Sequence, residues 1–353
     1  MCELFGLCAN KPVDISFSWR GFRKRGQANP DGWGVAWYVD EEGKLVGLVK
    51  EPRPAPESSI ARLLARGVKS HIIVSHVRFA SRGGESYVNT HPFVRKFRGR
   101  DWVFAHNGTV TSIMNDPAFG LRTFIPAGET DSEYAFCYIL EHLNRVSSEV
   151  LEDVLSLAKH IWKAATKIGR HGKFNFLLSN GTLLFAFSNR RGTIHYLLRH
   201  PPHVGYARLL DEDFKIDLGL VKAPDEAAVL IATRKLTNEN WVPLSSNELV
   251  VAYKGDIILR IPEKSRPETL LREKEREILC AVRLSPHAIS LGQLSETVRL
   301  PLEEVSEIVK SLLIRGYLRK DSRYDYPVNH PESRYYTDPV VRSIIDKLLL
   351  RRD

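Results

Sequence analysis

The chain has few cysteines and no long apolar run. Its four cysteines, in 353 residues, include no Cys-x-x-Cys pair, so the spacing indicates free thiols in a reducing cytoplasm rather than a zinc site or a disulfide framework. Its uninterrupted apolar runs, such as Ala227 to Ala232, are far too short to cross a bilayer. Glu3 follows Cys2 with no basic region and no long apolar segment behind it, which argues against a secretory signal. We therefore expect a cytoplasmic protein with no membrane partner.

Charge is plentiful, but it is not concentrated in one part of the chain. There are 51 Lys and Arg residues against 42 Asp and Glu residues, which gives a formal net charge of +9. Nucleic-acid binding uses basic residues that gather on one face. From residue 263 onward, 17 basic residues stand against 15 acidic ones, so seven of the nine net charges belong to residues 1–262. The excess is diffuse, and composition alone does not indicate a nucleic-acid partner.

Cys2 directly follows the initiator methionine. A small residue at position two permits removal of Met1, and Cys2 would then carry a thiol and a free α-amine on one Cα. An α-amine has a pKa of about 7.7–8.0, so it is partly neutral at physiological pH and can act as a local base for the thiol. A structural interpretation stays open, because Cys2, Leu4, Gly6 and Cys8 would share one face of a strand.

Polar side chains follow apolar runs that predict buried strands. One such run ends near Arg78, and another is followed by Asn107-Gly108. Capping-box spacing predicts a helix from about residue 130 to 144, with Asp131 in its first turn. Each group alone has a structural interpretation: Arg78 in an ion pair, Asn107-Gly108 in a hairpin turn, and Asp131 as a carboxylate favoured by the helix dipole.

Strands dominate residues 1–262, and two adjacent helices interrupt them. The second helix has apolar residues at helical spacing from Leu151 to Ile168. Asn180-Gly181 and Lys254-Gly255 predict hairpin turns, whereas the stretch from Trp19 to Arg23 is expected to be a loop. This pattern favours an α+β fold of two packed antiparallel sheets with helices outside, rather than a regular βαβ repeat.

Residues 263–353 have a different pattern and are predicted to form a second domain. The polar, proline-bounded segment Pro262 to Pro267 is the expected linker. Helices are predicted at about 268–283, 290–298 and 302–314, followed by a hairpin that begins at Gly316 and a last helix near 339–350. A helix, a helix-turn-helix and a hairpin in this order resemble a winged helix.

Taken together, the polar groups of the first domain suit acyl transfer. A thiol with its own amine, an Asn side chain beside a glycine amide, and a separate Arg and Asp would serve a zwitterionic amino-acid substrate. The sequence resembles the class II glutamine amidotransferases, the N-terminal-nucleophile hydrolases that attack the side-chain amide of glutamine. The matching segments are Met1-Cys2-Glu3-Leu4-Phe5-Gly6, His76-Val77-Arg78-Phe79-Ala80, Asn89-Thr90-His91-Pro92-Phe93, Phe104-Ala105-His106-Asn107-Gly108 and Gly128-Glu129-Thr130-Asp131-Ser132-Glu133. Asp31-Gly32-Trp33-Gly34 and Phe174-Asn175-Phe176-Leu177-Leu178-Ser179 look more like the compact, stand-alone branch of the family.

The resemblance implies a fold and a set of roles. Residues 1–262 would form the αββα sandwich of the N-terminal-nucleophile hydrolases. Cys2 would be the nucleophile, Asn107 and Gly108 the oxyanion hole, Arg78 the clamp for the substrate α-carboxylate, and Asp131 the partner of its α-ammonium. No cofactor and no metal are expected.

Three histidines near these motifs are tempting acid–base candidates. They are His76, His91 and His106. Because the amine of Cys2 can supply the base, we expect each histidine to be a structural, hydrogen-bonding residue.

The second domain leaves several alternatives open. The helix predicted at 302–314 carries Glu303, Glu304 and Glu307 in its first two turns, where DNA contact would require basic residues. Protein contact or homodimerisation is therefore favoured over nucleic-acid binding. The substrate could be glutamine or a γ-glutamyl compound, and ammonia could pass to a partner protein or simply be released. The rival function is a transcriptional regulator that senses a glutamyl ligand and binds DNA through the winged helix.

Overall fold

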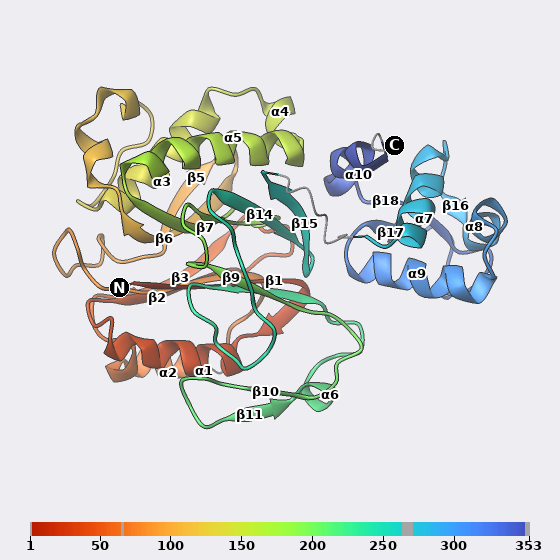
Figure 1. Ribbon diagram of the computed structural model, residues 1–353, viewed down its shortest axis with the longest axis horizontal. Coiled ribbons are helices and arrows are strands. Elements are labelled where there is room, and N and C mark those ends of the chain that lie inside the picture. Colours follow the sequence, from red (N-terminus) through yellow and green to blue (C-terminus); the bar gives the residue numbers. More distant parts are fainter. Residues whose placement is uncertain (1, 65–66, 263–270, 350–353) are drawn as a thin grey trace.

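The computed structural model describes residues 2–64, 67–262 and 271–349. Residues up to 262 form two stacked sheets with helices on the outer faces, and residues from 271 form a smaller body beside them (Figure 1). The predicted linker lies, from residue 263 on, outside the described residues. No helix in the described part of the chain is long and apolar enough to span a membrane.

The first sheet contains the N-terminal strand in its centre. Among the described residues its strands are, in spatial order, β13 (Val242–Pro243), β9 (His195–Arg199), β12 (Ala228–Ala232), β1 (Glu3–Asp14), β4 (Lys69–Val77), β2 (Trp33–Tyr38) and β3 (Val46–Glu51). Every neighbouring pair is antiparallel.

The second sheet packs against the first. Its described strands are, in spatial order, β15 (Asp256–Ile261), β14 (Glu248–Tyr253), β8 (Leu184–Ser188), β7 (Lys173–Ser179), β6 (Arg100–Thr109) and β5 (Phe93–Phe97). These pairs are antiparallel as well. The prediction of a mixed α and β fold with two antiparallel sheets is therefore confirmed.

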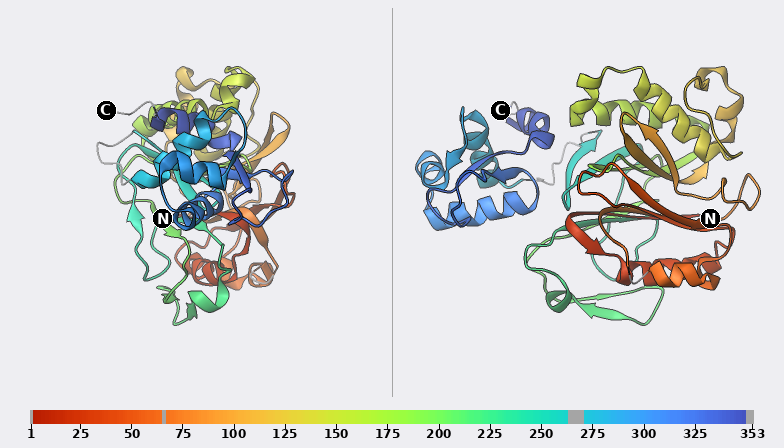
Figure 2. Two further views of the ribbon diagram at one scale, coloured as in Figure 1. Left: turned by 90° about the vertical axis from the view of Figure 1, so that its right-hand side faces the viewer. Right: turned by 180° about the vertical axis from the view of Figure 1, so that it is seen from behind.

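Helices cover the outer face of each sheet (Figures 1 and 2). The first sheet is covered by α1 (Ser16–Lys24) and α2 (Ser59–Leu64), and the second by α3 (Asp131–Asn144), α4 (Ser148–Glu152) and α5 (Val154–Ile168). The loop prediction for residues 19–23 is wrong. Trp19 and Phe22 are three positions apart, which puts both on one face of α1, where they are buried against Phe5 of the sheet.

The strand β1 alternates between two cores. Leu4 and Cys8 belong to the core between the sheets, whereas Phe5 and Leu7 pack beneath α1. The sheets approach closely at Gly6, where a Cβ would come within 2.9 Å of Leu177 Cδ1. Burial raises the pKa of the Cys8 thiol to about 12, so Cys8 is a small apolar residue of the core.

The hairpin turns predicted at Asn180-Gly181 and Lys254-Gly255 are present. Asn180-Gly181 joins β7 to β8, and Lys254-Gly255 joins β14 to β15, with a positive φ at Gly181, Lys254 and Gly255. Asn107-Gly108 is not a turn, because both residues lie inside β6 and pair with β7. An excursion that the sequence did not predict contains β10 (Tyr206–Arg208), β11 (Lys215–Asp217) and α6 (Leu218–Val221).

The second body has helices and a small sheet in the order that the sequence predicts. Its described elements are α7 (Glu273–Leu284), β16 (Ile289–Ser290), α8 (Leu291–Val298), α9 (Leu302–Ile314), β17 (Leu318–Lys320), β18 (Arg334–Thr337) and α10 (Arg342–Leu349). The capping box of α8 is confirmed, since Ser290 and Gln293 each bond the other's backbone N–H. The winged-helix assignment stays a prediction.

The two bodies are joined by crossed ion pairs. Asp256, from the β14–β15 hairpin, accepts from Arg315 at the end of α9 at 2.6 Å. In the reverse sense, Asp338 of the second body accepts from Lys254 at 3.1 Å and from the Tyr253 hydroxyl at 3.0 Å. Both carboxylates are buried, so each body supplies a charge that the other neutralises.

Candidate active site

The register of β1 and β4 brings Cys2 next to Arg78. In this antiparallel pair Glu3 lies opposite Val77, so the residue before β1 is adjacent to the residue after β4. Glu3 is anchored by a buried ion pair with Arg25 at 2.7 Å. This ion pair holds the first residue of β1 in place, and with it the adjacent Cys2.

The thiol of Cys2 is half-buried and contacts the backbone of Phe79. The Phe79 N–H donates to Sγ at 3.1 Å, and the thiol can donate to the Phe79 carbonyl oxygen, also at 3.1 Å. Burial raises the pKa of this thiol, although the Phe79 contact and the positive charge of Arg78 act in the opposite direction. The thiol is therefore neutral near pH 7, and a base must remove its proton before it can attack.

Asn107 reaches Cys2 from the other sheet. It lies in β6, is 3% exposed, and its Nδ2 donates to the carbonyl oxygen of Cys2. The same nitrogen carries a second hydrogen, which is available to a reacting oxygen beside the thiol. The structure thus brings together Cys2, Arg78 and Asn107, which are far apart in the sequence.

Gly108 follows Asn107 in β6 at a point where no side chain fits. It pairs with Phe174 of β7, and a Cβ at Gly108 would come within 1.8 Å of the Lys173 carbonyl oxygen. Only glycine allows β6 and β7 to approach this closely while Asn107 keeps its place.

Arg78 is buried, at 2% exposed, and its partners are carbonyl oxygens. Its terminal nitrogens donate to Gly83 at 2.9 Å, to Arg82 at 3.1 Å, and to Asp31 and Gly84 at 3.3 Å. It forms no ion pair with a carboxylate of residues 2–64, 67–262 or 271–349. Burial lowers its pKa, and the nearby Cys2 and Asp31 oppose this. A buried guanidinium without an ion-pair partner is costly.

Asp131 is the first residue of α3 and is 3% exposed. Its Oδ2 accepts from the Val110 N–H at 2.6 Å, and Val110 lies two residues beyond Gly108. The described residues contain no cation paired with it. The helix N-terminus favours its negative charge, so Asp131 is a fixed carboxylate at the same end of the sandwich as Cys2.

The three histidines are buried and electrically neutral. Nε2 of His76 lies 3.1 Å from the carbonyl oxygen of His106, and Nδ1 of His106 lies 2.8 Å from the Ser132 hydroxyl. His91 differs from our expectation, because neither of its ring nitrogens has a hydrogen-bond partner in the described part of the chain. It stacks instead on His76, with ring centroids 4.1 Å apart.

Burial determines the charge state of these histidines. It lowers the pKa of His76 to about 3 and lowers the pKa of His91 and His106 below the ordinary value. None of the three is protonated at neutral pH, so none can act as a charged acid there.

Sequence reasoning missed two supporting residues. Oδ2 of Asp31 accepts from the Ala80 N–H at 2.6 Å and thereby holds the chain that follows Arg78. Nδ2 of Asn175 donates to Oδ1 of Asn107 at 3.1 Å. Both residues lie in segments that resemble the family, but the sequence alone indicates no partner for either.

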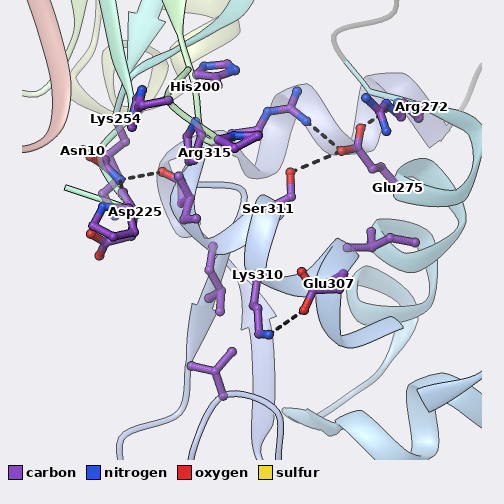
Figure 3. Close-up of a pocket in the computed structure, with 18 of the residues that line it drawn as sticks. Asn10, His200, Asp225, Lys254, Arg272, Glu275, Glu307, Lys310, Ser311 and Arg315 are labelled. Carbon is purple, nitrogen blue, oxygen red and sulfur yellow. Dashed lines mark hydrogen bonds and ion pairs between the residues drawn. The ribbon is translucent and has the colours of Figure 1, made fainter. Parts of the chain in front are cut away.

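No cluster that could hold a metal ion is present among the described residues. A cleft of about 1530 Å³ lies between the two bodies rather than at Cys2 (Figure 3). Most charged side chains in this cleft are paired, as Lys310 is with Glu307, and Arg315 is with Glu275. The cleft therefore offers no unpaired charge cluster comparable to Arg78 and Asp131.

The mixed α and β fold with two antiparallel sheets is similar to that of the N-terminal-nucleophile amidotransferases, and the comparison with known families agrees. The sequence profile of "Glutamine amidotransferases class-II" matches residues 1–277. The chain belongs to this family.

Relatives in other organisms match over different lengths. An uncharacterized protein of Methanocaldococcus jannaschii is 38% identical over 99% of this chain and 96% of its own. YafJ of Escherichia coli, named as a candidate glutamine amidotransferase, is 38% identical over 73% of this chain and 100% of its own.

Solved structures support the fold. The crystal structure of a predicted glutamine amidotransferase from Pseudomonas aeruginosa is 31% identical, with a TM-score of 0.52, over 73% of this chain and 100% of that chain. A structure described as the allosteric regulatory enzyme of purine biosynthesis has a TM-score of 0.50 at 14% identity, over 92% of this chain and 66% of that chain. At that identity the likeness concerns the fold alone.

Proposed function

We propose that this protein is a glutamine amidotransferase-type amidohydrolase in which Cys2, freed by removal of Met1, attacks the γ-carbonyl of glutamine or of a γ-glutamyl compound. The observation that carries the proposal is a pair of buried charges, Arg78 next to Cys2 and Asp131 bonded to Val110 shortly after Asn107. Arg78 and Asp131 are opposite in sign, and neither has an ion-pair partner among the described residues. A zwitterionic amino-acid end would neutralise both, with its α-carboxylate at Arg78 and its α-ammonium at Asp131.

The first half-reaction forms a thioester. The α-amine of Cys2 takes the thiol proton, the sulfur bonds to the γ-carbon, and the carbonyl oxygen becomes an oxyanion. The second hydrogen of Asn107 Nδ2 and the Gly108 N–H donate to that oxyanion. The C–N bond then breaks, and the amine of Cys2 passes its proton to the leaving nitrogen.

The second half-reaction releases glutamate. Water attacks the γ-glutamyl thioester, the C–S bond breaks, and the thiol regains its proton. Ammonia leaves when the substrate is glutamine, and an amine leaves when it is a γ-glutamyl compound. Because Arg78 and Asp131 would bind only the glutamyl end, we infer a stand-alone enzyme that accepts both, with any ammonia acceptor on a separate partner.

The C-terminal body, which we propose to be a winged helix, is better suited to protein contact than to DNA. Glu304 and Glu307 of α9 line the cleft that faces the catalytic domain, and they pair with Lys274 and Lys310. Carboxylates on this helix oppose phosphate binding. The sensor-regulator alternative has no comparable supporting observation.

The test measures glutamate release from glutamine and from a γ-glutamyl peptide by wild-type protein and by Cys2→Ala. Intact mass first establishes that Met1 has been removed from both. We expect release by the wild type and none above background by the variant. Phe79 bonds the thiol through its backbone N–H and carbonyl oxygen, so Phe79→Leu is a control that keeps these bonds and the nucleophile. Glutamate release that persists in Cys2→Ala would refute the nucleophile assignment.

A further inference from the structure

The side chain of Asn107 is held by a second buried amide. Asn175 lies directly opposite Asn107 in the β6–β7 register and is 0% exposed. Its Nδ2 donates to Oδ1 of Asn107 at 3.1 Å, while Nδ2 of Asn107 donates to Cys2. Both polar atoms of the Asn107 side chain are therefore engaged, one by the strand that carries the nucleophile and one by β7.

Two hydroxyl groups hold Asn175 from its other side. Its Oδ1 lies 2.9 Å from Ser188 Oγ and 3.0 Å from Thr193 Oγ1. These hydroxyls lie 2.8 Å apart, and each is also close to the Arg190 carbonyl oxygen. A hydroxyl has one hydrogen to donate, so two hydroxyls can satisfy both the Arg190 carbonyl and the Asn175 oxygen.

The direction of these hydrogen bonds matters for the chemistry, because the side-chain amide of Asn107 can point either its nitrogen or its oxygen toward Cys2. With Nδ2 toward Cys2, Asn107 offers a hydrogen to the reacting oxygen. With Oδ1 toward Cys2, it would present an acceptor to the Cys2 carbonyl and to a developing oxyanion, which repels both. The Asn175 donor at Oδ1 of Asn107 excludes this second orientation as long as the donor is present.

We propose that Asn175 is a positioning residue that fixes the orientation of the Asn107 amide and so makes Asn107 an oxyanion donor. The inference rests on the proposed amidohydrolase function. Asn175 itself does not touch the thiol in this arrangement. It acts through Asn107, and Ser188 and Thr193 act on it in turn.

Asn175→Asp tests the proposal with little change in shape. An ionised carboxylate only accepts hydrogen bonds, so it would draw Nδ2 of Asn107 away from Cys2. A protonated carboxyl keeps a donor and can leave Asn107 as it is. Burial raises the pKa of such a carboxyl, so the variant should work best at acidic pH. We expect kcat to fall about a hundredfold at pH 8, with KM nearly unchanged, and to recover by tenfold or more toward pH 5 relative to wild type.

A double variant separates positioning from simple structural damage. Once Asn107 is replaced, the orientation of its amide no longer exists, so Asn107→Ala/Asn175→Asp should be no slower than Asn107→Ala alone. Ser179→Ala is the matched control, because Ser179 is a buried polar residue of the same strand that bonds the β7–β8 turn instead. It should keep the wild-type kcat.

The outcomes distinguish the two levels of the argument. If the wild-type protein releases no glutamate, the proposed function fails and this inference fails with it. If the wild type is active and Asn175→Asp keeps its kcat, or loses it equally at every pH and additively with Asn107→Ala, the positioning role is wrong while the hydrolase function stands.

Discussion

The buried Arg78, beside the start of β1, donates hydrogen bonds to carbonyl oxygens. At the interface between the two bodies, by contrast, the buried carboxylates of Asp256 and Asp338 each meet a cation of the other body. A buried charge is costly unless an opposite charge compensates it. At the interface the protein supplies both members of each pair. At the thiol Arg78 has no ion-pair partner among the described residues, and in the function that we propose the substrate carboxylate takes that place.

The same contrast holds for the neutral polar groups. Near Cys2, the amides of Asn107 and Asn175 form a chain of hydrogen bonds that ends at the carbonyl oxygen of Cys2. At the interface, Asn10 bonds the backbone of Asp225, Ala227 and Ile314 and so joins the two bodies. In the function that we propose, the first amide network directs a hydrogen-bond donor toward the reacting oxygen, whereas the second holds parts of the chain together.

Among the variants that test this contrast, Asn107→Ala should have the largest effect, which is on kcat. Loss of one oxyanion donor costs about 2.7–4 kcal/mol of transition-state stabilisation, so kcat should fall about a hundredfold or more. Asn10→Ala, at the interface, should lower stability and leave kcat unchanged. Steady-state kinetics of both variants decide the matter, and a rise in KM alone for Asn107→Ala would contradict the assignment.

Arg78→Lys comes next. A lysine cannot reproduce the planar fork that binds a carboxylate at two points. Loss of a charge-assisted bond of roughly 1.5–3 kcal/mol should lower kcat/KM about ten- to a hundredfold, mainly through KM. Arg315→Lys makes the same change at the interface and should affect only unfolding by urea. If Arg78→Lys and Arg315→Lys changed kcat/KM equally, Arg78 would have no special role in binding the substrate.

Asp338→Asn should destabilise the docking of the second body without affecting glutamate release. Removing one member of a buried pair leaves charge uncompensated, and because Lys254 and Arg319 are partly exposed, we expect a loss of about 2 kcal/mol. Urea unfolding measures this loss. An unchanged midpoint would show that the ion pairs do not hold the interface.

The pH dependence of the same carboxylate gives a second measurement. Burial acts to raise the pKa of Asp338, but the Arg319 bond and the Lys254 charge outweigh it and lower the pKa below its ordinary value. A carboxyl with a lowered pKa stabilises the fold above its unfolded pKa of about 3.9, and this contribution is lost as the pH falls further. The difference in free energy of unfolding between wild type and Asp338→Asn should therefore become smaller below about pH 4.

The buried histidines should produce the smallest effect. Their pKa values are lowered by burial, so the unfolded chain binds more protons than the fold below pH 6.5, and stability falls as the pH decreases from about 6.5 toward 3. His91→Leu removes one such group. Between pH 7 and pH 6 the variant should lose roughly 0.5–1 kcal/mol less stability than wild type. Urea unfolding at the two pH values measures this loss. If wild type and His91→Leu lost the same free energy of unfolding between pH 7 and pH 6, this would contradict a neutral, buried His91.

Much of the site was predictable because its residues lie at the ends of recognisable strands and helices. Apolar runs before Arg78 and Asn107 mark buried strands, and Thr130 caps α3 through the Glu133 N–H at 3.1 Å. The alternative interpretation of Asn107-Gly108 as a hairpin turn is wrong, because Gly108 lies inside β6 and allows the close approach of β7. The loop prediction at Trp19 failed because Gly21 looked like a turn residue, although burial of Trp19 and Phe22 decides for a helix.

The sequence by itself determined the family, the mixed α and β class and the chemical types of the site, because these depend on local patterns and on the order of motifs. Only the tertiary structure decided which groups meet. Pairing of β1 with β4 sets Cys2 beside Arg78, and pairing of β6 with β7 sets Asn175 against Asn107. The physical reason is that antiparallel register, which is set by packing over the whole sheet, joins residues far apart in the chain.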